Sequence, residues 1–190
     1  MVRPTRWWHL DVLPANLSLN ELRDRLHAAV RPADASVLKS HLIKLAPSYD
    51  WILLDCPAGL DSLTINALVA SDGLVIPVAP PDVLAADGTF HMLTTVDRIR
   101  AGANPRLRML GVLLANTHLD RASERRQIAE LARSGLPLLT TVIPSSARVG
   151  AALAAFCPIV VHAPKSTVAA AFRELAAEIR ALANLGSVYI

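Results

Sequence analysis

The sequence predicts an α/β fold, a three-layer sandwich built on a mainly parallel sheet. Apolar runs of strand length, at 51–55, 73–79 and 109–115, each end at a polar residue or a turn, as buried parallel strands do. Segments with apolar residues at helical spacing separate these runs, and this alternation is typical of parallel sheets with right-handed crossovers. Hydrophobic residues make up 53% of the 190 residues and charged residues 18%, which suffices for one domain with a sizeable core.

In the first half, proline residues separate most of the expected elements. Pro14 ends the first strand, Pro32 stops the first helix, and Pro47 ends the second helix before the central strand. Pro80 closes the third strand. The expected elements are a strand at 7–13, helices at about 19–30 and 37–45, a strand at 51–55, a short helix at 64–70 and a strand at 73–79.

In the second half, glycine and strand-ending residues provide the boundaries. Gly102 and Gly135 follow the ends of two expected helices, and Asn116 and Pro144 end two expected strands. The expected elements are helices at about 83–100, 121–133, 147–155 and 166–184, strands at 109–115 and 138–143, and an edge strand at 158–162. The sequence contains no internal repeat, low-complexity tract or linker, so residues 1–190 are predicted to form a single domain.

The stretch 51–59, WILLDCPAG, is the most informative part of the chain. Asp55 ends an apolar run, and a Pro/Gly turn follows it. The carboxyl ends of strands in open α/β sheets face the crevice in which ligands bind, and a carboxylate there can hold the water shell of Mg²⁺. The residues alone leave a second interpretation open, in which Asp55 only caps the next turn. No G-x-x-x-x-G-K-[ST] phosphate loop and no Gly-Lys pair occur in the 190 residues.

The order and wording of the segments from residue 10 to residue 184 resemble the ParA/MinD family of deviant-Walker P-loop ATPases, which partition plasmids and chromosomes or place division sites. The matching segments are LDVLPAN at 10–16, the block 49–76 with DCPAG and LTINAL, GVLL at 111–114, TVIP at 141–144, Arg148, and PKS at 164–166. The resemblance implies a P-loop NTPase-like sheet that lacks its P-loop strand here.

The resemblance implies ATP and magnesium as cofactors and assigns a role to each matching residue. Asp55 would be the catalytic Walker B acid, holding magnesium through water. Pro57 and Gly59 would belong to the nucleotide-binding switch loop, and Gly59 would offer a backbone N–H to the terminal phosphate. Asn116 and Pro144 would line the adenine, since an amide can both donate to and accept from a base edge. Each of these residues is also an ordinary turn or strand-end residue, and that interpretation stays open.

Arg148 and Lys165 are the DNA-binding candidates that the resemblance implies. A guanidinium group binds phosphate oxygens in a fork, and such contacts give affinity without reading sequence. Lys165 could equally be a solvated surface charge. The arginines of the helix at 121–133 share it with acidic residues, so pairing within the helix is the simpler expectation for them. The net charge of +3 permits contact with nucleic acid without requiring it.

The partners implied are a second copy or a full-length ParA-type subunit in a dimer, a ParB-like centromere-binding protein, and non-specific DNA. Cys56 and Cys157 are expected to be buried thiols, which favours a location in the reducing cytoplasm. The resemblance also implies association with the nucleoid. No stretch is apolar enough to span a bilayer, so no membrane insertion is expected.

The missing phosphate loop leads to three hypotheses about the chain. It is a ParA-like partition protein whose full product begins upstream, a truncated non-hydrolysing paralogue that regulates a full-length ParA/MinD-type ATPase, or another deviant-Walker nucleotide-binding protein such as a synthetase. In each case ATP hydrolysis by these 190 residues alone is expected to be negligible. The strand at 51–55 would also have an unpaired apolar edge, and Trp7 and Trp8 are expected to fold over it.

Overall fold

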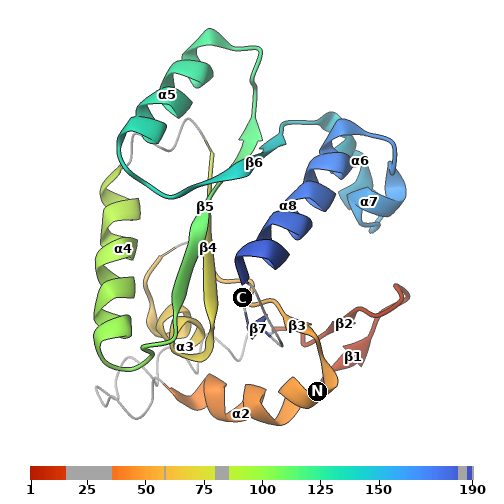
Figure 1. The fold of residues 1–190 in the computed structure, drawn as a ribbon. Helices are drawn as coiled ribbons and strands as arrows, with labels where there is room; N and C mark the ends of the chain where they lie inside the picture. Colours follow the sequence, from red (N-terminus) through yellow and green to blue (C-terminus); the bar gives the residue numbers. More distant parts are fainter. Residues whose placement is uncertain (16–35, 58, 80–85, 184–187, 190) are drawn as a thin grey trace.

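The computed structural model describes residues 1–15, 36–57, 59–79, 86–183 and 188–189 of the chain (Figure 1). The described strands are β1 (Arg3–Pro4), β2 (Asp11–Val12), β3 (Trp51–Ile52), β4 (Gly73–Val78), β5 (Arg108–Thr117), β6 (Leu138–Pro144) and β7 (Val188–Tyr189). The described helices are α2 (Val37–Leu45), α3 (Ser62–Ala70), α4 (Ala86–Ala101), α5 (Ala122–Arg133), α6 (Ala147–Ala154), α7 (Ile159–His162) and α8 (Thr167–Ala183), with the 3₁₀-helix η2 (Ala46–Ser48). No helix of these ranges is long and apolar enough to cross a membrane.

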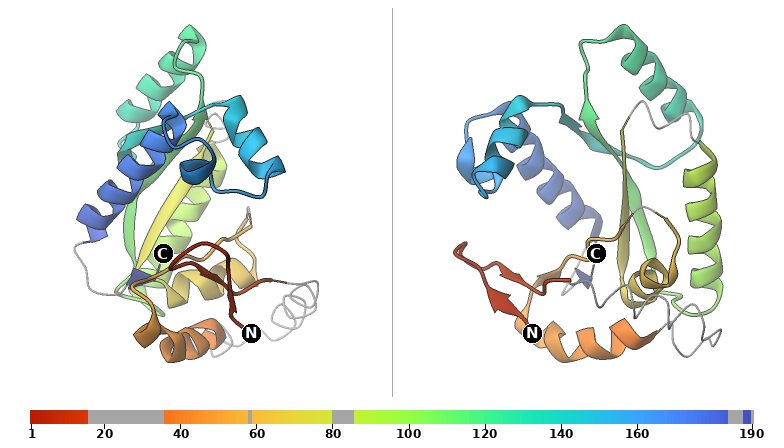
Figure 2. Two further views of the ribbon diagram at one scale, coloured as in Figure 1. Left: turned by 90° about the vertical axis from the view of Figure 1, so that its right-hand side faces the viewer. Right: turned by 180° about the vertical axis from the view of Figure 1, so that it is seen from behind.

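The main sheet of the described residues has the order β4–β5–β6, and all three strands run parallel. Side chains alternate between its two faces, as the pleat requires. On β4, Leu74 packs against the cluster that includes α3 and α4, whereas Val75 packs against the cluster that includes α8. Helices therefore cover both faces (Figures 1 and 2), and the predicted α/β class with a parallel sheet is confirmed.

Two apolar clusters form the core, one on each face of the sheet. On one face, Leu113 of β5 and Leu139 of β6 pack against Val168 of α8. The other cluster consists of Leu68, Val69, Val96, Ile99 and Leu107, from α3, α4 and the segment that enters β5. These side chains are at most about a tenth exposed, so the strands they come from are fixed in place by burial on both sides.

The edge strand β6 is irregular, and a side chain of α8 accepts hydrogen bonds from two of its N–H groups. Between the pairs Val112–Leu138 and Leu114–Val142, β6 contains two residues more than β5, which displaces Thr140 and Thr141 from a regular ladder. The carboxylate of Glu178 accepts hydrogen bonds from the N–H of Thr140, at 2.6 Å, and of Thr141, at 2.8 Å.

Three sequence predictions about strands are wrong in part. The strand expected at 51–55 is limited to Trp51–Ile52 and pairs in parallel with β7, because a strand persists only where a neighbour completes its ladder. The strand expected at 7–13 is a two-residue strand, Asp11–Val12, paired antiparallel with β1. The edge strand expected at 158–162 is the helix α7, in which the N–H of His162 donates to the carbonyl of Pro158.

The other described elements confirm the predictions with shifts of one to three residues at their ends. The helix expected at 19–30 and the start of the one expected at 83–100 lie outside the described residues. Neither cysteine forms a disulfide, as expected, but Cys56 is exposed and only Cys157 is partly buried, so the prediction of two buried thiols is wrong. Cys56 lies in the irregular loop after β3, where no neighbouring strand covers it.

Candidate functional site

The carboxyl ends of β5 and β6 form a corner that brings Asn116 and Pro144 together. Ala115 pairs with Ile143 and Thr117 pairs with Pro144, so Asn116 is an extra residue between two ladder pairs. Its φ of 55° lies in the left-handed region, which asparagine tolerates better than most residues. Such a bulge re-aims a side chain, and the exposed Asn116 amide makes no hydrogen bond to a described residue. The amide is therefore free to bind a ligand.

Hydrogen bonds join this corner to the start of α6. The N–H of Ser145 donates to the carbonyl of Thr117 at 2.8 Å, which ties the two strand ends together. Ser146 caps α6, and its hydroxyl accepts from the N–H of Arg148 at 3.3 Å. Arg148 is exposed in the first helical turn, and its guanidinium forms no hydrogen bond or ion pair with the described part of the chain. It is therefore available to an anion from outside.

Asp55 lies in the irregular loop between β3 and α3. The residue is exposed, and its carboxylate makes no hydrogen bond or ion pair within the described ranges. Partial desolvation of the Cys56 sulfur raises the pKa of that thiol, and the negative charges of Asp55 and Asp61 raise it further. Both carboxylates therefore disfavour a negative charge on the Cys56 sulfur.

Asp61 has a structural role that the sequence allowed for. Its Oδ1 accepts from the N–H groups of Leu63 and Thr64, at 3.0 and 2.9 Å, and so caps α3. This capping leaves Asp55 as the uncommitted carboxylate of the loop. Asp55 neither points into a packed interior nor follows an antiparallel strand.

Pro57 and Gly59 are both exposed in the same loop. Gly59 has a φ of 119°, a conformation that side chains other than hydrogen rarely permit, and its N–H makes no hydrogen bond to a described residue. The backbone N–H of Gly59 is therefore available to a ligand, and its role toward a phosphate stays a prediction.

The Asp55 loop and the Asn116–Pro144 corner occupy different parts of the structure. In Figure 1, β3 lies low, beside β7, whereas β5 and β6 end in the upper half of the molecule. No hydrogen bond among the described residues joins the loop to the corner. The structure therefore brings Asn116, Pro144 and Arg148 into one region and places Asp55, Pro57 and Gly59 in another.

The described residues could help to bind a magnesium ion whose other ligands are water and the phosphates of a nucleotide. The described residues contain no group of three or more acidic, histidine or cysteine side chains that could hold a metal ion by themselves. Mg²⁺ bound beside phosphates usually takes one or two carboxylates and keeps several waters. The exposed, unpaired carboxylate of Asp55 can supply this oxygen donor, whereas a protein cage for the ion is not present in the described ranges.

The other basic candidates divide into free and engaged groups. Lys165 is exposed in the turn between α7 and α8, with no partner among the described residues. On α5, Arg121 pairs with Glu124 at 3.4 Å, and the Nη1 of Arg125 donates to the carbonyls of Leu119 and Asp120. The expected pairing with acidic residues is confirmed for Arg121, whereas the side chains of Arg125, Arg126 and Arg133 donate to nearby backbone carbonyls.

Trp7 and Trp8 do not cover the strand at 51–55, contrary to prediction. Trp8 is 90% exposed, and Trp7 lines a groove together with residues of the turn between α6 and α7. The tryptophans belong to the β1–β2 hairpin, whose position depends on contacts with that distant turn. Sequence reasoning missed this groove, and the signal that could have indicated it is the absence of acidic residues from 131 to 173.

Comparisons with known proteins agree with this architecture. Residues 1–109 match the family AAA_31, described as an AAA domain. Over 182 residues the chain is 36% identical to the chromosome-partitioning ATPase Soj of Thermus thermophilus, covering 95% of this chain and 69% of that protein. It is 35% identical over 188 residues to the sporulation initiation inhibitor protein Soj of Bacillus subtilis, covering 95% and 71%. The structure of cobyrinic acid a,c-diamide synthase from Mycobacterium smegmatis with bound ADP and magnesium is 28% identical, with a TM-score of 0.73, covering 88% of this chain and 60% of that one.

The parallel sheet, its helical layers and these matches define the fold of a P-loop ATPase. Within that class, the chain belongs to the ParA/MinD family of deviant-Walker ATPases. The chain spans 60% of the synthase chain and 69% of the Thermus protein. That this chain shares an activity of those whole proteins is therefore a proposal.

Proposed function

We propose that this chain acts in ParA-type partition of chromosome or plasmid DNA, by binding DNA non-specifically in a nucleotide-dependent manner. The observation that carries the proposal is the 36% identity to the chromosome-partitioning ATPase Soj over 95% of the chain. The free guanidinium of Arg148 and the free ammonium of Lys165 support it, because unpaired exposed cations bind phosphate without losing an internal partner.

The nucleotide-dependent part of the proposal assigns ATP and magnesium to the Asn116–Pro144 corner and the Asp55 loop, which one nucleotide would bridge only once these two regions approach each other. Asn116 and Pro144 line the adenine, and the Asn116 amide reads its edge. Asp55 orients magnesium through water, and Pro57 with the free N–H of Gly59 senses the terminal phosphate. Bound ATP would supply phosphate oxygens as ligands for magnesium, and Asp55 and Asn116 would orient the nucleotide.

The proposal includes partners. The chain acts as a dimer, either with a second copy or with a full-length ParA-type subunit, and the similarity to the Soj proteins supports this. A ParB-like centromere-binding protein is the cargo adaptor. The site of action is the cytoplasm, on the nucleoid.

Salt-dependent DNA binding tests the proposal. Anisotropy of a labelled duplex of arbitrary sequence is measured over a series of salt concentrations, with and without ATP and magnesium. We expect Arg148→Ala to lower affinity and to reduce the slope of log K against log salt by about 1, and Lys165→Ala to act similarly, because each removes one phosphate contact.

Arg126→Ala is the matched control. Arg126 is also an exposed helical arginine, but its Nε donates to the carbonyl of Ala122 on α5. Equal slopes for the wild-type chain, Arg148→Ala and Arg126→Ala would contradict a role of Arg148 in DNA binding and with it the partition function.

Two other functions have support from particular observations. The absence of a phosphate loop in the 190 residues favours a regulator that binds a full-length ParA/MinD-type ATPase. The similarity to a diamide synthase favours another nucleotide-binding member of the group. Capture of the tagged chain together with a P-loop protein whose ATPase rate it changes would identify the regulator. DNA binding that Arg148→Ala does not change would favour the other nucleotide-binding member of the group.

A further inference from the structure

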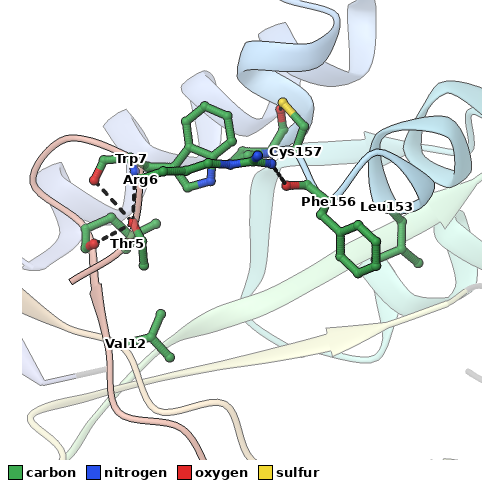
Figure 3. A pocket seen from close by; sticks show the side chains of 9 residues that line it. Thr5, Arg6, Trp7, Val12, Leu153, Phe156 and Cys157 are labelled. Carbon is green, nitrogen blue, oxygen red and sulfur yellow. Dashed lines mark hydrogen bonds between the residues drawn. The ribbon is translucent and has the colours of Figure 1, made fainter. Parts of the chain in front are cut away.

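The N-terminal hairpin lies against a turn that follows it by about 150 residues in sequence. Nη2 of Arg6, in the loop of the hairpin, donates to the carbonyl oxygen of Phe156, between α6 and α7. The same guanidinium lies 4.8 Å from the centre of the Trp7 ring, within the range of a cation–π contact. Figure 3 shows Arg6 reaching across from the hairpin to Phe156. The two segments are thus held side by side.

Between them lies a groove of about 570 Å³. One wall comes from the hairpin, with Thr5, Arg6, Trp7, Leu10 and Val12. The other comes from the end of α6 and the turn after it, with Leu153, Phe156, Cys157 and Pro158. Sites that take small ligands or anchoring side chains have volumes of about 300 to 1,000 Å³, so this groove has the size of a recognition site.

Large apolar side chains are left exposed on the C-terminal wall. Leu153 is 75% exposed and Phe156 is 85% exposed, and in Figure 3 their side chains lie next to each other. Phe156 has a φ of 47°, a left-handed conformation that is costly for a bulky aromatic residue. Exposed apolar groups gathered at a groove are typical of an interaction surface.

The C-terminal wall of the groove carries no acidic residue. Residues 131–173, which include α6 and α7, contain no aspartate or glutamate. Arg6 is the charged residue in the lining, and apart from Phe156 its guanidinium has no hydrogen-bond partner among the described residues. Asp11, the acid of the hairpin, is engaged, because its Oδ2 accepts from the hydroxyl of Tyr49 at 2.7 Å. An occupant with a carboxylate therefore meets the N–H groups of Arg6 that Phe156 does not use, opposite a wall without acidic residues.

We propose that this groove is a docking site for a segment of a partner protein that presents a large apolar side chain beside a carboxylate, such as one face of an acidic amphipathic helix. Apolar anchors of such a helix recur at i, i+3, i+4 and i+7 and fill a groove between two walls. A concave site with walls from two segments suits a peptide. The docking site goes beyond the partition function and does not depend on it.

A designed peptide provides the test with the full chain. The probe is a labelled helical peptide with Leu and Phe at the anchor positions and Glu between them, and binding is followed by anisotropy. We expect roughly tenfold weaker binding for the same peptide with Lys in place of Glu, and for Leu153→Ser and Phe156→Ser. Arg6→Gln is expected to abolish the preference for the Glu peptide. Thermal unfolding of each variant verifies folding, which exposed positions 153 and 156 should not disturb.

Leu119→Ser is the control, since Leu119 is 49% exposed but follows β5, outside the groove. It should leave peptide binding unchanged. Absence of binding, equal losses for Leu119→Ser and Phe156→Ser, or no preference between the Glu and Lys peptides would overturn the proposal. Binding to phosphatidylglycerol vesicles that depends on Phe156, without peptide binding, would also overturn it and identify a lipid surface instead.

Discussion

Gly111 occupies a position in β5 where a side chain does not fit. A Cβ atom built there lies 2.5 Å from Cδ2 of Leu139 and 3.1 Å from the carbonyl oxygen of Pro137. The next residue shows why the approach is close, because the N–H of Val112 donates to that same carbonyl at 2.8 Å. The entry of β6 is thus fixed on the backbone of β5, and the position of Pro144 at the far end of β6 depends on it.

We expect Gly111→Ala to lower the free energy of unfolding by about 1 to 3 kcal/mol, because Leu139 must leave its place in the core. Gly150→Ala is the matched control. A Cβ there meets no atom within 4 Å, and on helix α6 alanine should be neutral or stabilising by about 0.5 to 1 kcal/mol. Urea denaturation measures both. Similar losses for the two variants would contradict the close packing at Gly111.

The sequence predicts some pairs of site residues and not others. Asn116 and Pro144 end consecutive strands, and parallel strands end at the same edge of a sheet, so their closeness follows from local patterns. The contact between Arg6 and Phe156 joins residues 150 positions apart and depends on a bent turn, which no local pattern encodes. The bulge at Asn116 is likewise apparent only from how the residues of β5 pair with those of β6.

Helix α8 does more than cover one face of the sheet, because Glu178 bonds to the irregular part of β6. Partial burial of Glu178 raises the pKa of its carboxyl, but hydrogen bonds from Thr141 and Thr140 outweigh this and leave the pKa below its ordinary value. The N–H groups that Glu178 takes are then not available to another strand. Residues 159–162 form the helix α7 although Ile, Val and Val favour a strand.

The contribution of Glu178 to stability depends on pH. Its folded-state pKa is lowered, so the contribution is complete above the ordinary pKa of glutamate, falls below it, and is lost once pH drops through the folded pKa. We expect Glu178→Gln to lose about 1 kcal/mol at neutral pH and to show a weaker decline in stability on acidification than the wild-type chain. Chemical denaturation over a pH series measures this. Glu174→Gln changes an exposed position of the same helix and should behave as wild type. The same decline on acidification in the wild-type chain, Glu178→Gln and Glu174→Gln would contradict a stabilising role of the hydrogen bonds between Glu178 and β6.

Among the elements, the strands with long apolar runs were the most predictable. β4, β5 and β6 lie within three residues of the predicted boundaries, because a buried strand needs an apolar run and its ends need turns. β3 could not be placed in this way. Its run of four apolar residues, ended by an acid, predicts a strand, but within the described residues only β7 pairs with it, over two residues. Leu53, the next residue, is 73% exposed.

For the molecule as a whole, the separation of β3 from the main sheet determines how nucleotide can bind. A triphosphate is held mainly by backbone N–H groups and a lysine of a phosphate loop, and the 190 residues contain no such motif. The Asp55 loop after β3 and the Asn116–Pro144 corner after β5 and β6 lie in different parts of the structure (Figure 1). Each region alone offers one or two polar contacts.

We therefore expect calorimetry of the 190-residue chain with ATP and magnesium to give a dissociation constant of about 1 mM or weaker, because unconnected contacts cannot offset the charge and entropy of a bound triphosphate. Asp55→Ala should change this value little, since the carboxylate orients magnesium only when phosphates are already held beside it. Adding a partner that carries a phosphate loop should tighten binding and make it sensitive to Asp55→Ala and Asn116→Ala together. Micromolar, magnesium-dependent binding by the chain alone would show instead that β3 joins the sheet beside β4 once nucleotide is present, and that the loop and the corner then form one site.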